Sequence, residues 1–161
     1  MTQLPKNITF RKATIDDVET LVEFRIRFLS EFPKNLEGKD IPSFKARLAD
    51  YFRRAIPSGE LISYLAERDD ETVGCSGLIR WQFIPGFAKN SENRGYIFNV
   101  YTVPEERGKG IATSMVALLI EEAKKLGIGR LSLHSRSEAE SIYRKAGFTD
   151  DWDKELILRL V

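Results

Sequence analysis

The chain has 161 residues, of which 42% are hydrophobic and 30% are charged, and its formal net charge is +1. This balance is typical of a globular protein and the length suits one core, so residues 1–161 are expected to form a single domain. A net charge so close to zero gives no overall field that would attract nucleic acid or an anionic membrane, and neither is expected as a partner.

Further absences narrow the class of protein. Cys75 is the only cysteine, which excludes an intrachain disulfide and a cysteine-rich zinc site, and no metal site is expected. No apolar stretch approaches the length of a membrane span. The first six residues lack the apolar segment of a signal peptide, so we expect a cytoplasmic protein.

The first part of the chain predicts one strand followed by two helices. Residues 8–13 alternate in polarity and predict a short strand. Thr14 or Asp16 can cap a helix that runs to about residue 32. After a polar loop, Ser43 can cap a second helix, which stops before Pro57.

The rest of the chain predicts a mixed sheet of the α/β class. Strands are expected over residues 61–67, 72–83, 95–103, 130–134 and 155–160, with helices over about 110–126 and 137–146. The first three of these strands are spaced like antiparallel hairpins. The strand–helix–strand unit around residues 96–134 should instead be parallel and right-handed, so the sheet should contain both kinds of pairing.

A glycine-rich turn joins the strand that ends near Val103 to the following helix. The turn continues as Pro104-Glu105-Glu106 and then Arg107-Gly108-Lys109-Gly110-Ile111-Ala112. Glycines let the backbone approach a ligand closely, and the free N–H groups of a helix start attract anions. Arg107 and Lys109 add positive charge at the same place. The turn is therefore predicted to bind phosphate.

Three phosphate-binding motifs compete for this turn. A P-loop requires Lys-Ser/Thr after its last glycine, whereas Gly110 is followed by Ile111. A dinucleotide fingerprint that starts at Gly108 would require a third glycine where Thr113 stands. The pattern that remains is Arg/Gln-x-x-Gly-x-Gly/Ala, which Arg107, Gly110 and Ala112 satisfy.

This pattern resembles the acetyl-CoA pyrophosphate loop of the GNAT family of N-acetyltransferases. The downstream run Tyr143-Arg144-Lys145-Ala146-Gly147-Phe148 resembles the Leu-Tyr-x-Lys-x-Gly-Phe signature of the same family, and the likeness extends over nearly the whole chain. The resemblance implies a mixed, twisted central sheet with splayed middle strands, flanked by helices. It also implies acetyl-CoA as cosubstrate. A plain strand-to-helix connection is the alternative reading of the turn.

The resemblance also implies which residues hold acetyl-CoA. The pyrophosphate would lie on the turn and the helix start, and the pantetheine arm would pair with the splayed strand. The implied cofactor-binding residues are Tyr101, Val103, Arg107, Gly108, Lys109, Gly110, Ile111, Ala112 and Thr113. The thioester oxygen would accept a hydrogen bond from the backbone N–H of Val100 or Tyr101, between which the sequence does not decide.

Two proton transfers need side chains. By resemblance Tyr143 is the candidate acid for the departing thiolate, because a phenol stays protonated at neutral pH; a cofactor contact is the alternative. Residues 97–100 lack the carboxylate that many family members use as the base. The candidates that remain are His134, which titrates in the useful range, and a water ordered by Asn99. A structural role is the alternative for His134.

The resemblance implies that the first two helices and the connection between strands wall the acceptor pocket. These supply Phe24, Arg25, Phe28, Glu31, Trp81, Phe83 and Phe87. Arg25 interrupts an apolar helix face and can bind an acceptor carboxylate or form a surface ion pair. Arg136 stands where many family members carry an asparagine that touches the cofactor, so it is expected to contact phosphate or to face water.

The sequence thus predicts an enzyme that moves an acetyl group from acetyl-CoA to a primary amine by direct attack in a ternary complex. The acceptor would be a small molecule or a peptide, and a homodimer is the candidate assembly. The alternative function is a non-catalytic acyl-CoA-binding or regulatory module of the same fold.

Overall fold

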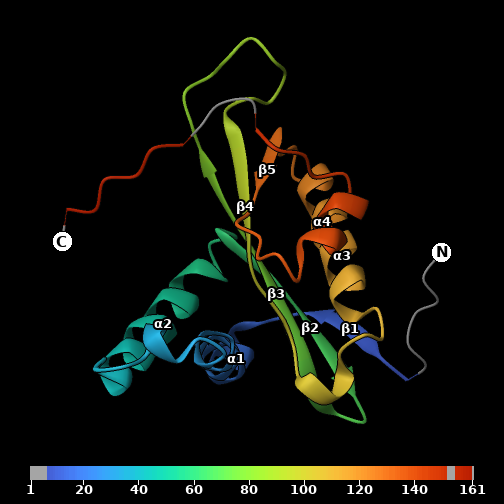
Figure 1. The fold of residues 1–161 in the computed structure, drawn as a ribbon. Helices are drawn as coiled ribbons and strands as arrows, with labels where there is room; N and C mark the ends of the chain where they lie inside the picture. Colours follow the sequence, from blue (N-terminus) through green and yellow to red (C-terminus); the bar gives the residue numbers. More distant parts are fainter. Residues whose placement is uncertain (1–6, 152–154, 161) are drawn as a thin grey trace.

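A five-stranded mixed sheet forms the centre of the molecule (Figure 1). The computed structural model describes residues 7–151 and 155–160. The strands are β1 Thr9–Lys12, β2 Leu61–Arg68, β3 Glu71–Gln82, β4 Asn93–Thr102 and β5 Arg130–Ser132, and they lie in chain order across the sheet. The first four pair antiparallel, and β5 is parallel to β4. The mixed sheet expected from the sequence is therefore confirmed.

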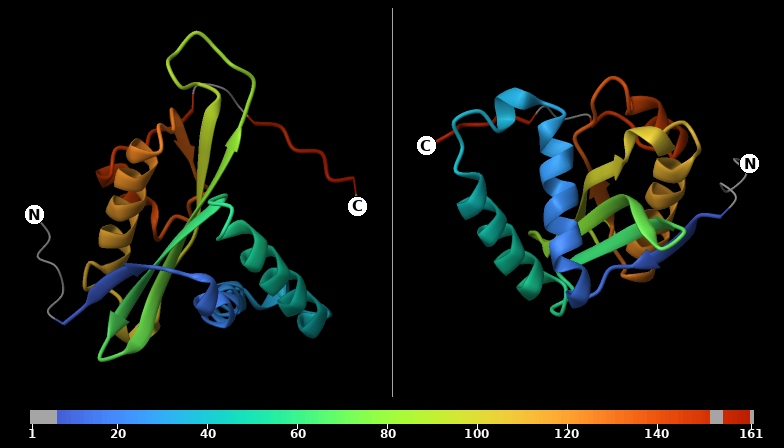
Figure 2. Two further views of the ribbon diagram at one scale, coloured as in Figure 1. Left: turned by 180° about the vertical axis from the view of Figure 1, so that it is seen from behind. Right: turned by 90° about the horizontal axis from the view of Figure 1, so that it is seen from below.

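Helices cover both faces of this sheet (Figure 2). One face carries α1 Val18–Ser30 and α2 Ile41–Ala55, and the other carries α3 Ile111–Lys125 and the short α4 Glu140–Lys145. Each layer buries its own core against the sheet: Leu21, Phe24 and Phe52 belong to the first core, and Leu119 and Ala123 belong to the second. No helix in the described part of the chain is long and apolar enough to cross a membrane.

Side-chain caps fix where the first two helices begin. Thr14 forms a capping box with Asp17 around a short 3-10 turn, Ile15–Asp17, from which α1 continues. The expected cap of α2 was wrong, because Asp40 takes that role and its Oδ1 accepts the N–H of Ser43 at 3.0 Å. Pro42 fits the first turn of α2, where a backbone N–H has no intrahelical partner.

A bulge near the middle of β4 changes its pairing with β3. The register passes from Gly77 opposite Phe98 to Cys75 opposite Tyr101, so β4 has one more residue than β3 in this stretch. Asn99 lies in the bulge with φ 51°, a left-handed conformation that asparagine tolerates better than most residues.

The strands β4 and β5 pair over only a short stretch and then separate. Their paired residues run from Arg94 to Tyr96 on β4, whereas β4 continues to Thr102. The described chain therefore has splayed middle strands, as expected, and the gap opens directly beside the bulge.

The strand expected over residues 155–160 is not formed, and this prediction was wrong. The segment runs away from the sheet without strand pairing (Figure 1). Its large apolar side chains are exposed, namely Leu156, Ile157, Leu158 and Leu160. Its sequence has the composition of a strand, but a strand requires a neighbour to accept its backbone hydrogen bonds.

Candidate active site

The glycine-rich turn has the backbone shape that its glycines permit. Gly108 and Gly110 have φ values of 74° and 83°, which lie in the left-handed region where a side chain is disfavoured. Gly110 is also the N-cap of α3, and no side chain caps this helix end. The turn and the helix start are therefore held together by backbone geometry.

The first turn of α3 presents donors that have no partner within the helix. The first intrahelical bond is donated by the N–H of Ser114 to the carbonyl of Gly110 at 3.0 Å. The N–H groups of Ile111, Ala112 and Thr113 precede it and point out of the helix start. Together with the two glycines, these free N–H groups give the helix start the donors that can bind an anion.

The two cations of the turn are held by neighbouring groups. Arg107 Nε donates to the carbonyl of Thr102 at 2.9 Å, and its guanidinium lies over the ring of Tyr101 and forms an ion pair with Glu31. Lys109 Nζ pairs with the carboxylate of Glu106 at 3.2 Å. A phosphate ligand would therefore compete with carboxylates of this chain for both side chains.

The register of β4 determines which backbone groups face the gap. The backbone N–H of Val103 donates a hydrogen bond to the carbonyl of Val73 at 2.9 Å, so the backbone polar groups of Val103 point toward β3. In an antiparallel ladder, residues two apart point the same way, so Tyr101 also faces β3 while Val100 and Thr102 face the gap. The structure therefore differs from the expectation that Tyr101 and Val103 present their backbone there.

Tyr143, His134 and Tyr96 line one cavity of about 1110 Å³ beside β5. Tyr143 comes from α4 and packs edge-on against Phe148, with ring centroids 6.1 Å apart. Burial raises the pKa of Tyr143, so its phenol stays protonated at neutral pH. The cavity includes none of the residues of the glycine-rich turn.

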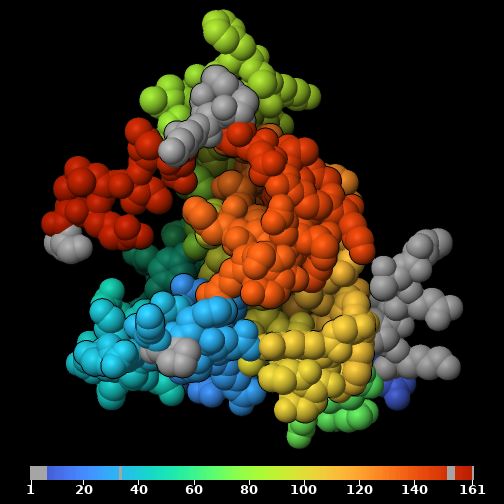
Figure 3. Space-filling model, in the orientation of Figure 1, coloured from blue at the N-terminus to red at the C-terminus, as the bar shows by residue number. Residues whose placement is uncertain are grey.

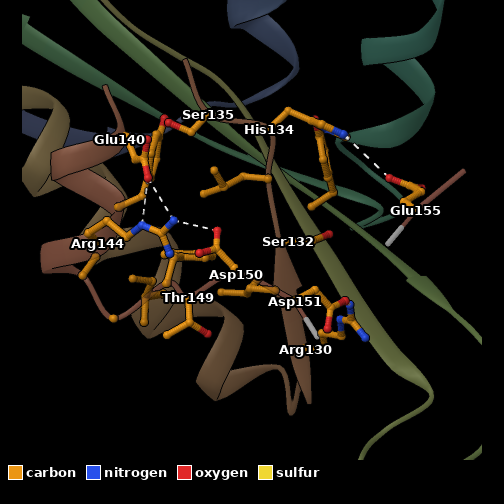
Figure 4. Close-up of a pocket in the computed structure, with 18 of the residues that line it drawn as sticks. Arg130, Ser132, His134, Ser135, Glu140, Arg144, Thr149, Asp150, Asp151 and Glu155 are labelled. Carbon is orange, nitrogen blue, oxygen red and sulfur yellow. Dashed lines mark hydrogen bonds and ion pairs between the residues drawn. The ribbon is translucent and has the colours of Figure 1, made fainter. Parts of the chain in front are cut away.

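His134 lines this cavity with an exposed side chain. Its Nδ1 is 2.7 Å from the hydroxyl of Tyr96. Its Nε2 is 3.8 Å from the carboxylate of Glu155 (Figure 4). The side chain is 72% exposed, so solvent can exchange protons with the ring. Figure 4 also shows Arg144 between Glu140 and Asp150, and ion pairs with these two carboxylates compensate its positive charge.

Asn99 is held on the other side of β4, facing α1. Asn99 is 7% exposed, and its Nδ2 donates a hydrogen bond to the sulfur of Cys75 at 3.1 Å. Its Oδ1 accepts from Arg25 at 3.4 Å. The amide is thus committed to protein contacts. Burial also raises the pKa of Cys75 to about 12, which keeps that thiol neutral.

Two contributions to the site were not expected from the sequence. Tyr96 was not singled out, although its hydroxyl contacts His134, which lies just after the neighbouring strand β5. Glu31 was expected to wall the acceptor side, but it pairs with Arg107 of the cofactor turn instead. Strand register and helix placement create both contacts, and no local motif marks them. In Figure 3 the end of α1 (blue), the 104–112 segment (gold) and the segment after β5 (orange) meet on one face.

Comparison with known proteins identifies relatives of this architecture. The model of the acetyltransferase (GNAT) family matches residues 23–148. A crystal structure of a predicted acetyltransferase from Clostridium acetobutylicum with acetyl-CoA is 32% identical, with a TM-score of 0.84 over 95% of this chain and 96% of that chain.

Two structures with lower sequence identity show only that the fold is similar. A GCN5-related N-acetyltransferase from Ralstonia eutropha JMP134 is 21% identical, with a TM-score of 0.77 over 94% of this chain and 98% of that one. A glucosamine-6-phosphate N-acetyltransferase from Arabidopsis thaliana is 16% identical, with a TM-score of 0.71 over 97% and 100% of the two chains. Comparison of the sequence with curated proteins finds no match.

Proposed function

The chain belongs to the acetyltransferase (GNAT) family, and from this premise we propose that it transfers the acetyl group of acetyl-CoA to a primary amine by direct attack in a ternary complex. The proposal rests on the position of two structural features relative to each other. The gap between β4 and β5 opens beside a helix start whose N–H groups have no partner within the helix. One extended ligand with an anion at one end can occupy both.

Acetyl-CoA fits this arrangement from its pyrophosphate to its thioester. The pyrophosphate accepts from the N–H groups of residues 108–113, and the pantetheine arm pairs with the outward backbone groups of Val100 and Thr102. The Clostridium acetobutylicum relative, which was crystallised with acetyl-CoA, supports this choice of donor. Arg107 reaches the pyrophosphate when it leaves Glu31.

The chemistry then requires one bond to form and one to break. The amine nitrogen attacks the thioester carbon, and the oxygen of that carbonyl accepts the N–H of Val100 as negative charge develops, a contribution of about 3 kcal/mol. The C–S bond breaks, and Tyr143 donates its proton to the departing thiolate. The proton that the amine loses passes to His134 or to solvent water beside it, since the side chain of His134 is exposed to solvent.

The alternative function is a module that binds acyl-CoA without catalysis. The absence of a carboxylate from residues 97–100 favours it, because the family's usual base is missing. A thiol-release assay with acetyl-CoA and a panel of amines, amino acids, polyamines and peptide N-termini separates the two functions. Thiol release that depends on an acceptor supports the enzyme. Tight acetyl-CoA binding by calorimetry, without release for any acceptor, supports the module.

A further inference from the structure

The half-buried side chains of Arg25 and Arg136 both lie over the ring of Phe28 beside the gap. The guanidinium carbons of Arg25 and Arg136 lie 5.5 Å and 5.4 Å from the centroid of this ring. Arg25 comes from α1, and Arg136 comes from the segment after β5, so the pair bridges the two halves of the molecule. Arg136 thus stacks on Phe28 of α1 and on Phe32, which follows that helix.

Neither arginine has a carboxylate partner in the described part of the chain. Among the described residues, Arg25 makes one long hydrogen bond, to Asn99 Oδ1 at 3.4 Å, and one terminal nitrogen of Arg136 is buried without a hydrogen-bond partner. By contrast Arg11, Arg107 and Arg144 all form ion pairs. Desolvation lowers the pKa of Arg25, which shows that its charge is poorly compensated.

Leaving such groups half-buried costs stability unless something else satisfies them. A guanidinium carries five N–H donors, and burying a charge without a partner is unfavourable. The ring faces of Phe28 and Phe98 offset part of this cost, since Arg25 lies 5.5 Å and 6.0 Å from their centroids. The remaining donors are available to an anion from outside the chain.

We propose that Arg25 and Arg136 bind a carboxylate of the acceptor, which makes the acceptor an amine-bearing carboxylic acid with an apolar side chain. This inference rests on the proposed function and names its substrate class. A carboxylate matches the fork of a guanidinium with two parallel hydrogen bonds. The rings of Phe28 and Phe98 provide an apolar wall for the side chain of the acceptor.

The position of Arg25 also places the amine correctly. Arg25 contacts Asn99, and the next residue, Val100, faces the gap where the thioester oxygen would lie. In an α-amino acid one carbon carries both the carboxylate and the amine. Fixing the carboxylate at Arg25 therefore directs the amine toward the thioester, a gain in orientation that lowers the barrier.

The first test compares acceptors that differ only in the acid group. Thiol release is measured with L-phenylalanine, L-phenylalaninamide and phenethylamine, with the corresponding leucine series, and with glucosamine 6-phosphate as a phosphate-bearing amine. The free acids are expected to have the highest kcat/KM, by roughly tenfold or more. The amides and decarboxylated amines lose a hydrogen-bonded charge pair, and the sugar phosphate has no apolar side chain for the wall of Phe28 and Phe98. Equal or better turnover of the amides, the decarboxylated amines or the phosphate overturns the inference and leaves the proposed function intact.

The second test changes the arginines. Arg25→Gln is expected to raise KM for the free acid roughly tenfold to a hundredfold, and Arg25→Lys to raise it less, while phenethylamine turnover stays within about twofold. The unchanged amine reaction shows that the variant is folded. Arg27→Gln is the matched control, because this exposed neighbour pairs with Glu23. An equal effect on acid and amine assigns Arg25 a structural role and overturns the inference.

If no acceptor in the panel reacts, a binding measurement tests the proposed carboxylate site. N-acetyl-L-phenylalanine and its amide are titrated into the protein saturated with coenzyme A. Preferential binding of the acid, weakened by Arg136→Gln, supports the carboxylate site even if the proposed catalysis fails. Equal or absent binding of the two products overturns it.

Discussion

Arg107 and Glu31 form an ion pair that joins the turn before α3 to the residue that directly follows α1. The two residues are 76 positions apart in the chain. The pair occupies Arg107 of the turn that we propose binds the pyrophosphate, so the layer of α1 and α2 is connected to that turn.

We expect Glu31→Gln to strengthen acetyl-CoA binding. Removing the carboxylate releases Arg107 for the pyrophosphate, and because the pair is partly exposed the gain should be about 0.3–1 kcal/mol, or roughly two- to fivefold in Kd. Calorimetry at low and high salt measures it, and the gain should shrink as salt screens the charges. Glu23→Gln, which removes a partner of Arg27, is the control. Unchanged or weaker binding would show that Arg107 does not reach the ligand.

A second prediction concerns the glycine at the start of α3. Gly110→Val should abolish acetyl-CoA binding, because a β-branched residue at φ 83° strains the backbone by at least about 1–2 kcal/mol and moves the N–H groups of the helix start. Gly38→Val carries a similar strain at φ 66° in the loop between α1 and α2, where a Cβ meets open space. Normal calorimetric binding by the Gly110 variant would refute the phosphate assignment of the turn.

The glycine-rich turn was predictable because its signal is local. Gly108, Gly110 and the helix after them appear in the chain in the order in which they act, and the structure gives them the positive φ values that the motif requires. The strands β2 to β4 were also close to expectation, since alternating polarity and turn residues mark them directly.

The direction in which the β4 backbone faces was not predictable in the same way. Side chains and backbone groups alternate with a period of two, so a shift of one residue reverses every assignment. The bulge at Asn99 introduces such a shift, and Val100 and Thr102 face the gap in place of Tyr101 and Val103. Pairing between strands sets this register, and the sequence of β4 alone does not contain it.

Lowering the pH should reduce the free energy of unfolding through the protonation of Asp17. Asp17 accepts two hydrogen bonds from Arg11, at 2.7 Å and 2.8 Å, and a third from the N–H of Thr14 at 2.7 Å. These contacts lower the pKa of Asp17 in the folded state, with the bonds from Arg11 as the largest cause. Its stabilisation is therefore present above the unfolded pKa of about 3.9 and is lost as the pH falls below that value.

We accordingly expect Asp17→Asn to lower the free energy of unfolding by about 1–3 kcal/mol at neutral pH. The difference from the wild type should shrink as the pH falls below about 4, because the wild-type carboxylate is then protonated. Urea unfolding across this pH range measures it. Asp50→Asn is the control, since that side chain is exposed and should change stability by less than about 0.5 kcal/mol. A pH-independent difference would contradict the assignment.

The last prediction separates catalysis from binding at Tyr143. If this phenol protonates the leaving thiolate, Tyr143→Phe should lower kcat by roughly 10²- to 10⁴-fold and leave the Kd of acetyl-CoA nearly unchanged. The ring still packs on Phe148, so folding is preserved. Tyr51→Phe, on α2, is the control and should keep full turnover.

The pH profile provides an independent check on the same group. Burial raises the pKa of Tyr143 above its usual value near 10, so the proton donor is present throughout the neutral and mildly alkaline range. The wild-type kcat should therefore show no falling limb below about pH 10 from this residue. A loss of acetyl-CoA affinity with unchanged kcat in Tyr143→Phe would make Tyr143 a cofactor contact. Tyr96, whose hydroxyl is 2.7 Å from Nδ1 of His134 in the same cavity, would then be the next candidate for the acid.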